Sequence, residues 1–208
     1  MVRLLSHKFK KYAKGWLIFF LLVIDVFFMS YLLPTVGASI TRNSTSAVPI
    51  DLMFFYTPQT VYKLIAEYGD AARETYRSIA LTIDIEHQVV YTLLFSLLIT
   101  WLFQKGYDSK SKMQKYNVVP MGAFAADLLE NFGIITMLSI HPSTPAIVAW
   151  LTTFFTMTKW LFVSASIALV IIGVIALASK ELRQNRRSHR HSNSRHSDKS
   201  SQDTTKRS

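Results

Sequence analysis

The sequence predicts an all-α membrane protein: a four-transmembrane-helix bundle with an outer interfacial helix and a disordered basic C-terminal tail. Three observations support this fold class. Of the 208 residues, 50% are hydrophobic, the mean hydropathy is positive (+0.23), and the apolar residues are gathered into four stretches that are each long enough to cross a bilayer. No water-soluble core is expected, so we predict a single transmembrane domain, 16–179.

Lysine and arginine are unevenly distributed along the chain, and their distribution predicts the topology. Of the 23 basic residues, five precede Trp16, four lie between Gln104 and Tyr116, and nine lie from Lys180 onward. Because Lys and Arg concentrate in cytoplasmic loops, we expect both termini and the loop 105–115 to be cytoplasmic. This arrangement requires an even number of crossings. We therefore expect a multi-pass protein of the plasma (inner) membrane, and this distribution of the net charge of +10 argues against a nucleic-acid partner.

The chain should begin with a basic cytoplasmic segment, 1–15, and a first span, 16–33. The basic segment either lies on anionic headgroups as a short amphipathic helix or acts only as a topology signal. We expect Pro34 to end the first span, because proline disrupts a helix interior. Alternatively, the span is a signal peptide with a small-residue cleavage site at 36–38, which would leave three spans and conflict with the charge distribution.

The outer loop, 34–70, is expected to contain a helix that lies on the membrane surface and partly covers the bundle. Thr57 is a good cap, Pro58 fits the first turn, and Gly69 is a good stop. The segment 52–68 is rich in aromatic residues, which prefer the membrane interface, and an ordinary interfacial anchor would have the same composition. The triplet that begins at Asn43 matches a glycosylation acceptor, which has no meaning in a bacterium.

Three further spans are expected at about 79–103, 118–140 and 150–179. Asp70 can cap a helix that continues from Ala71 to Gln104, so the first turns of this helix should project beyond the membrane. Small residues cluster in the third and fourth spans and predict close helix packing. Residues 180–208 are polar, repetitive and nearly free of apolar side chains, so we expect a disordered cytoplasmic tail.

Ionisable side chains within the spans are the strongest functional signal. A charged group near the bilayer centre costs about 2.5 to 3.5 kcal/mol on insertion scales, so such groups normally face a bundle interior and find partners. By helical periodicity, Asp84 shares one face with His87, and Asp127 shares one face with Glu130 and Asn131. We therefore predict an inward polar pocket with the following candidate residues: Asp25, Asp84, His87, Asp127, Glu130, Asn131 and Lys159.

Four roles remain open for these residues. In a proton or cation relay, Asp127 and Glu130 would share a proton that passes toward His87 and Asp84. In a membrane enzyme, paired carboxyl groups would carry out acid/base chemistry on a lipid or isoprenoid. A metal site would need the second and third spans to combine their acids with the one intramembrane histidine. In a structural or accessory subunit, the same groups would cross-link helices, for example as a pair of Lys159 with Asp84.

We favour a protein that binds or moves a proton, cation or small solute through this pocket, with the membrane enzyme and the accessory subunit as alternatives. No catalytic residue is assigned. We expect no cofactor and no metal, and the absence of cysteine excludes disulfides, thiolate metal ligands and thiol nucleophiles. The expected partners are the lipid bilayer, a lipid or small cation as ligand, and a membrane-protein partner or a second copy of the chain.

Three motifs resemble an uncharacterised family of small bacterial four-span membrane proteins: EYGDAARETYRSIALTIDIEH, MGAFAADLLENFG and TMTKWLFVSAS. The resemblance covers about residues 60–170, its most specific part is 126–131, and it implies no activity. A second resemblance, of architecture alone, is to the sterol isomerase-like four-helix membrane proteins. It implies intramembrane acids that bind amine ligands or move a double bond, and it supplies no set of catalytic residues for this chain.

Overall fold

The computed structural model describes residues 2–41 and 48–205, and within these residues the chain is all-helical, without strands. In the same part of the chain, four helical stretches are long and apolar enough to cross a membrane: Gly15–Ile40, Pro58–Gly106, Lys112–Ile140 and Ala146–Gln184. The prediction of an all-helical chain with four stretches long and apolar enough to cross a membrane is therefore confirmed. The candidate glycosylation site at Asn43 lies outside the described residues.

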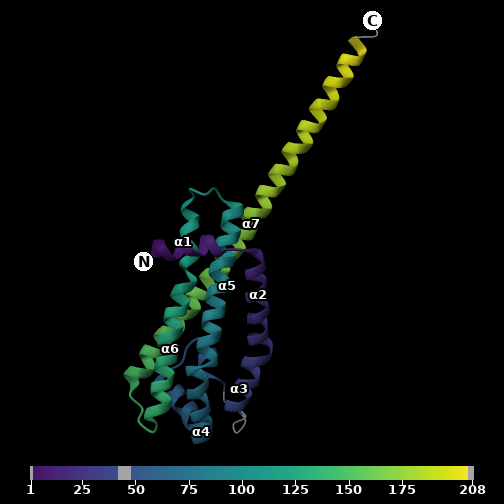
Figure 1. Ribbon diagram of the computed structural model, residues 1–208. Coiled ribbons are helices and arrows are strands. Elements are labelled where there is room, and N and C mark those ends of the chain that lie inside the picture. Colours follow the sequence, from purple (N-terminus) through teal and green to yellow (C-terminus); the bar gives the residue numbers. More distant parts are fainter. Residues whose placement is uncertain (1, 42–47, 206–208) are drawn as a thin grey trace.

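The chain runs back and forth between two ends of the bundle (Figure 1). α1 (Val2–Tyr12) lies across one end, from which α2 (Gly15–Phe27) leads away; α5 (Ile83–Gly106) returns, α6 (Pro120–Ile140) leads away and α7 (Ala146–Thr205) returns. The connection between α5 and α6, with η3 (Lys112–Val118), lies beside α1. Both termini therefore leave from this end, which we call the basic end, and the opposite end is called the distal end.

The first span continues past Pro34, so the prediction that it ends there is wrong. α2 passes directly into a π-helical turn, η1 (Phe28–Leu32), and then into α3 (Leu33–Thr41). Proline lacks an N–H group, and its ring clashes with the carbonyl group four residues earlier. The wider π-helical turn lies just before Pro34 and accommodates this clash, so the helix crosses with a bulge instead of stopping.

The helix predicted to be continuous from Ala71 to Gln104 is divided in two. α4 (Pro58–Leu81) begins with the predicted cap, since the Thr57 side chain accepts a backbone hydrogen bond. It is interrupted at Gly69, as predicted, where φ is 77°. A second break at Thr82 (φ −123°, ψ −85°) separates α4 from α5. This break is the correction to the prediction, and it lets α4 pack across α3 and α6 at the distal end.

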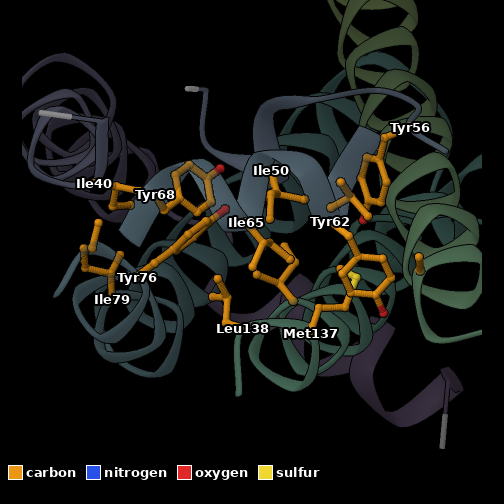
Figure 2. Packing of buried hydrophobic residues seen from close by; sticks show 14 residues of the cluster. Ile40, Ile50, Tyr56, Tyr62, Ile65, Tyr68, Tyr76, Ile79, Met137 and Leu138 are labelled. Atoms are coloured by element: carbon orange, nitrogen blue, oxygen red, sulfur yellow. The ribbon is translucent and has the colours of Figure 1, made fainter. Parts of the chain in front are cut away.

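A cluster of buried aromatic and aliphatic side chains fills the distal end (Figure 2). It is built from α3, η2 (Ile50–Leu52), α4, α6 and the start of α7. Tyr56, Tyr68 and Tyr76 are at most 2% exposed, and their hydroxyl groups lie within hydrogen-bond distance of other segments. These tyrosines are therefore core residues. Within the aromatic segment 52–68, Phe54 and Phe55 remain exposed, at 59% and 51%.

Glycines allow α7 to approach α5 and α6 closely. A Cβ atom added at Gly133 would overlap the Thr152 side chain, and one added at Gly173 would lie 2.8 Å from Leu102 Cβ. Lipid chains leave little hydrophobic driving force between membrane helices, so association depends on van der Waals packing of this kind. Gly133 and Gly173 thus pack closely against neighbouring helices.

The basic N-terminal segment forms a helix that covers the basic end. α1 packs against α5 and η3, and Phe9 is buried in a cluster with Ile18, Leu21, Leu94 and Leu97. Its backbone also takes part, because Asn117 Nδ2 donates a hydrogen bond to Ser6 O at 3.3 Å. α1 is therefore an integral part of the bundle and not only a topology signal.

α7 continues beyond the bundle as a helix to Thr205, and its C-terminal part projects away from the other helices (Figure 1). Lys180 Nζ donates a hydrogen bond to Lys105 O at 2.7 Å, close to the point where α7 leaves the bundle. The basic tail, for which we expect disorder, thus lies apart from the four-helix core. An isolated polar helix gains no packing energy, which is the reason for that expectation.

Candidate functional site

A cavity of about 400 Å³ lies between the first span and α7. Its walls come from the first span, α5, α6 and α7, and two residues of η2 complete them. Six of the seven candidate pocket residues line it, and the seventh, Glu130, contacts the lining residue Lys159. The lining residues are Asp25, Met29, Leu33, Asp51, Leu52, Asp84, His87, Gln88, Tyr91, Phe95, Asp127, Asn131, Lys159, Trp160, Val163 and Ile167.

Lys159 is the centre of a buried charge cluster. Its Nζ atom lies 2.6 Å from Glu130 Oε2 and 3.5 Å from Asp127 Oδ1, and it donates a hydrogen bond to Asp51 O at 3.0 Å. Lys159 and Asp127 are each 7% exposed and Glu130 is 0% exposed, so one ammonium group faces two carboxyl groups away from solvent. The alternative pair of Lys159 with Asp84 does not form, because the closely packed α6 brings its own acids to α7.

Hydroxyl groups hold the two carboxylates of this cluster in place. Thr156 Oγ1 donates a hydrogen bond to Glu130 Oε1 and Tyr91 OH donates one to Asp127 Oδ2, both at 2.9 Å. Tyr56 OH lies 3.4 Å from Thr156 Oγ1, and burial raises the pKa of Tyr56 to about 12, so its hydroxyl group stays protonated at neutral pH. The cluster therefore joins α5, α6, α7 and the segment before α4, as the structural role predicts.

His87 and Asp25 form a second polar pair, between α5 and α2. His87 Nε2 lies 3.2 Å from Asp25 Oδ1, and neither atom makes a well-aligned hydrogen bond with the described residues. The imidazole ring stacks on Phe28 with a centroid distance of 5.4 Å and lies 5.5 Å from the Tyr91 ring. These aromatic contacts fix its orientation. The sequence places both residues in the pocket but does not predict their pairing, which depends on the face of α2 that meets α5.

Asp84 and Asn131 lie near the break between α4 and α5. Asn131 Nδ2 donates a hydrogen bond to Ala80 O at 3.4 Å, and this carbonyl group belongs to the last turn of α4, where helical partners are missing. Asn131 therefore stabilises the break. Asp84 lines the cavity and makes neither a hydrogen bond nor an ion pair within the described chain, so its carboxylate is open to a ligand.

The cavity also contains residues that the candidate set omits. Asp51 reaches it from the outer loop, and its carboxylate accepts a hydrogen bond from Tyr76 OH at 2.5 Å. Its position depends on the fold of that loop, so no local pattern marks it. Gln88 and Tyr91, in contrast, share the helical face of Asp84, as the 3.6-residue period predicts.

Apolar side chains form the rim of the cavity. Met29 on η1, Leu52 on η2 and Ile167 on α7 are 58%, 61% and 45% exposed. α2 packs along α5 and makes no comparable contact with α7, so the cavity occupies the space between the first span and α7. Exposed apolar side chains on a membrane-crossing segment face acyl chains. The cavity thus combines a charged interior with a rim suited to lipid.

Acidic groups outnumber basic groups in the cavity. Four aspartates line it, Asp25, Asp51, Asp84 and Asp127, together with one lysine and one histidine. The lysine already contacts two carboxylates, and the histidine faces Asp25. Among the side chains of residues 4–40 and 48–184, no three His, Cys, Asp or Glu groups are placed so that they could hold a metal ion. The excess of carboxyl groups favours a positively charged ligand.

No protein-family model, curated protein or solved structure matches this chain. The resemblances to small bacterial four-span proteins and to sterol isomerase-like proteins therefore stay predictions. The geometry and charge of the cavity are accordingly the basis on which a function can be assigned.

Proposed function

We propose that this protein binds a cationic amphiphile, an ammonium group attached to an apolar chain, in the cavity between the first span and α7. The observation that carries the proposal is the open carboxylate of Asp84. Lys159, the lysine that lines the cavity, forms ion pairs with Glu130 and Asp127 and none with Asp84 among the described residues. A charge that is removed from water gains most from an opposite charge, so an ammonium group is the chemical complement of this carboxylate.

The apolar rim supports an amphiphile over a fully polar solute. A ligand that enters between η1 and α7 would pass Met29 and Ile167, which suit an alkyl chain, before its head reaches Asp84. The cavity volume of about 400 Å³ falls within the range of small-molecule sites. The head and the first part of a chain would lie inside, and the rest of the chain would remain among the lipids.

The distribution of basic residues supports a plasma-membrane orientation with the basic end in the cytoplasm. Of the 23 Lys and Arg residues, 18 belong to the two termini and the loop 105–115. In this orientation α4 covers the outer end as a surface helix. A second copy of the chain or another membrane protein on the exposed faces of α2 and α7 stays a prediction.

Ligand-dependent stabilisation of the full chain tests the proposal. The thermal unfolding midpoint is measured in dodecylmaltoside micelles with dodecyltrimethylammonium, dodecanol or dodecanoate, and with tetramethylammonium as the head alone. We expect stabilisation by the cationic amphiphile only, of about 2.7 kcal/mol at a free concentration of 100 times Kd. Asp84→Asn should weaken binding about 10- to 100-fold, because it removes a charge-assisted contact.

Glu86→Gln is the matched control, since Glu86 lies on the same helix but is exposed. It should bind the cationic amphiphile as the parent does. Equal stabilisation by dodecanol and dodecyltrimethylammonium would overturn the proposal, and so would an undiminished effect in Asp84→Asn. If tetramethylammonium stabilises the protein as strongly as dodecyltrimethylammonium does, the ligand is a small ammonium ion and the amphiphile is refuted.

A second candidate function, acid/base chemistry on a lipid or isoprenoid, is favoured by the His87–Asp25 pair. His87 borders the cavity, and Asp25 lies where it can orient the ring and balance a proton on it. Incubation of the protein with an isoprenoid alcohol in deuterated water tests this role. Deuterium uptake into carbon positions that is lost in His87→Gln would support an enzyme, and no uptake above a protein-free control would refute it for that class.

A further inference from the structure

Polar side chains recur at every fourth position of α5. They start at the cavity and extend to the basic end: Asp84, Gln88, Thr92, Ser96, Thr100 and Gln104. At about 1.5 Å of rise per residue, neighbouring members lie about 6 Å apart along the axis, and the series turns by about 40° per step. We call this series the α5 stripe.

The four middle members of the α5 stripe are buried inside the bundle. Gln88, Thr92, Ser96 and Thr100 are 2%, 3%, 0% and 1% exposed. Serine and threonine in helices often bond back to the carbonyl group four residues earlier, as Thr100 does to Ser96 O at 2.6 Å. The side-chain oxygens of Gln88, Thr92 and Ser96, however, have no hydrogen-bond partner among the described residues. Buried polar groups are normally satisfied, so this series calls for an additional partner.

At the basic end the stripe joins a set of polar contacts with α1 and η3. Asn117 Nδ2 donates a hydrogen bond to Thr100 Oγ1 at 2.9 Å, and Gln104 Nε2 donates one to Lys10 O at 3.1 Å. Asn117 is 0% exposed, and its Oδ1 atom also lacks a partner within the described part of the chain. Gln104 is exposed. Polar side chains therefore follow one another from the cavity to the surface of the basic end.

We propose that the α5 stripe is a hydrated access path, through which water and protons reach the cavity from the basic end. One water molecule that bridges two hydroxyl groups by hydrogen bonds of about 2.8 Å spans about 5.6 Å, which matches the spacing of the stripe. A buried water needs about two to four polar partners, and the stripe side chains and helix carbonyl groups supply them.

The access path would serve the ligand cavity, so its role in the protein rests on the proposed function. It ends at Gln88, which lines the cavity one turn from Asp84. When a cation enters or leaves, the excess charge of the cavity changes, and protons supplied along the stripe can compensate for it. The existence of the path, however, is independent of any ligand and can be tested without one.

Introduced thiols report the hydration of the stripe directly, because the parent chain contains no cysteine. Ser96→Cys places a thiol in the middle of the stripe, and Leu97→Cys places one at the adjacent apolar position, which is 3% exposed. Silver ion is the probe, since it is small, needs water to approach and binds thiolates. Proteoliposomes that contain the full chain are exposed to silver ion, and unreacted thiol is then labelled with a maleimide after denaturation.

We expect Ser96→Cys to react at least about tenfold faster than Leu97→Cys, because a thiol in dry apolar surroundings is inert. Thr92→Cys should react as Ser96→Cys does, and it tests the same claim if Ser96→Cys fails to fold. Adding Ser96→Val to Thr92→Cys should suppress the reaction with silver ion supplied at the basic end, whereas adding Leu97→Val should not. Both stripe thiols reacting as slowly as Leu97→Cys would overturn the path.

The thiol measurement tests the access path and the alkylammonium measurement tests the ligand, so one proposal can be refuted while the other holds. Rapid reaction of the stripe thiols with silver ion, together with no alkylammonium binding, would support the path and refute the proposed ligand. Slow reaction of the stripe thiols with silver ion, together with the expected alkylammonium binding, would refute the path and support the ligand.

Discussion

Replacing Lys159 by methionine tests whether the buried charge cluster holds the bundle together. Methionine keeps an unbranched, flexible side chain and removes the ammonium group that contacts Glu130, Asp127 and Asp51 at 2.6, 3.5 and 3.0 Å. Removing one partner of a buried ion pair costs about 3 to 5 kcal/mol, because the remaining charge stays buried. Glu130 is 0% exposed, so we expect Lys159→Met to lower the free energy of unfolding by about 3 to 5 kcal/mol.

The assay is reversible unfolding in dodecylmaltoside micelles titrated with sodium dodecyl sulfate, followed by tryptophan fluorescence and far-UV circular dichroism. Lys180→Met is the control, because Lys180 is exposed, and it should change stability by no more than about 0.5 kcal/mol. Glu130→Gln in the Lys159→Met background removes the orphaned charge and should recover about 1 to 3 kcal/mol. A single variant within about 1 kcal/mol of the parent, or a double variant that recovers nothing, would refute the reasoning.

Two glycine substitutions test the helix packing and the helix bend in the same assay. Gly133→Ala would place a methyl group against the Thr152 side chain with no room for it, so α6 and α7 must separate, and we expect a loss of about 1 to 3 kcal/mol. Gly15→Ala meets its nearest neighbour, Trp101 Nε1, only at 4.0 Å and should be nearly neutral, and equal effects of the two would contradict the close contact. Gly69→Ala should cost about 1 to 2 kcal/mol although nothing lies within 4 Å, because its φ is 77°; an unchanged midpoint would argue against that conformation.

Part of the cavity follows from helical periodicity, and part does not. The period of 3.6 residues places Asp84 with His87 and Asp127 with Glu130, and all four lie at the cavity or in contact with its lining. The partner of each group does not follow from it. Lys159 contacts the acids of α6 because glycine lets α6 and α7 pack closely, and Asp25 meets His87 because α2 packs along α5.

Some of the helix breaks also follow from local sequence, and others depend on the tertiary structure. Thr57 and Gly69 act through local chemistry, a side-chain cap and a positive φ, so their roles could be read from the residues alone. The bulge before Pro34 and the break at Thr82 could not. A proline within a membrane helix is tolerated when the surrounding backbone adjusts, and the break at Thr82 depends on a distant side chain, Asn131, that satisfies a freed carbonyl group.

The order of residues along the chain is enough to predict four stretches long and apolar enough to cross a membrane, basic residues concentrated at the termini and in one loop, and acids within the four stretches. Those properties follow from local hydropathy and helical period, which act over one or two turns. Which acids form an ion pair with Lys159, and which do not, depends on how the helices pack against one another. Lys159 and the loop residue Asp51 enter the cavity from distant parts of the chain, and the contacts among them depend on how closely whole helices pack.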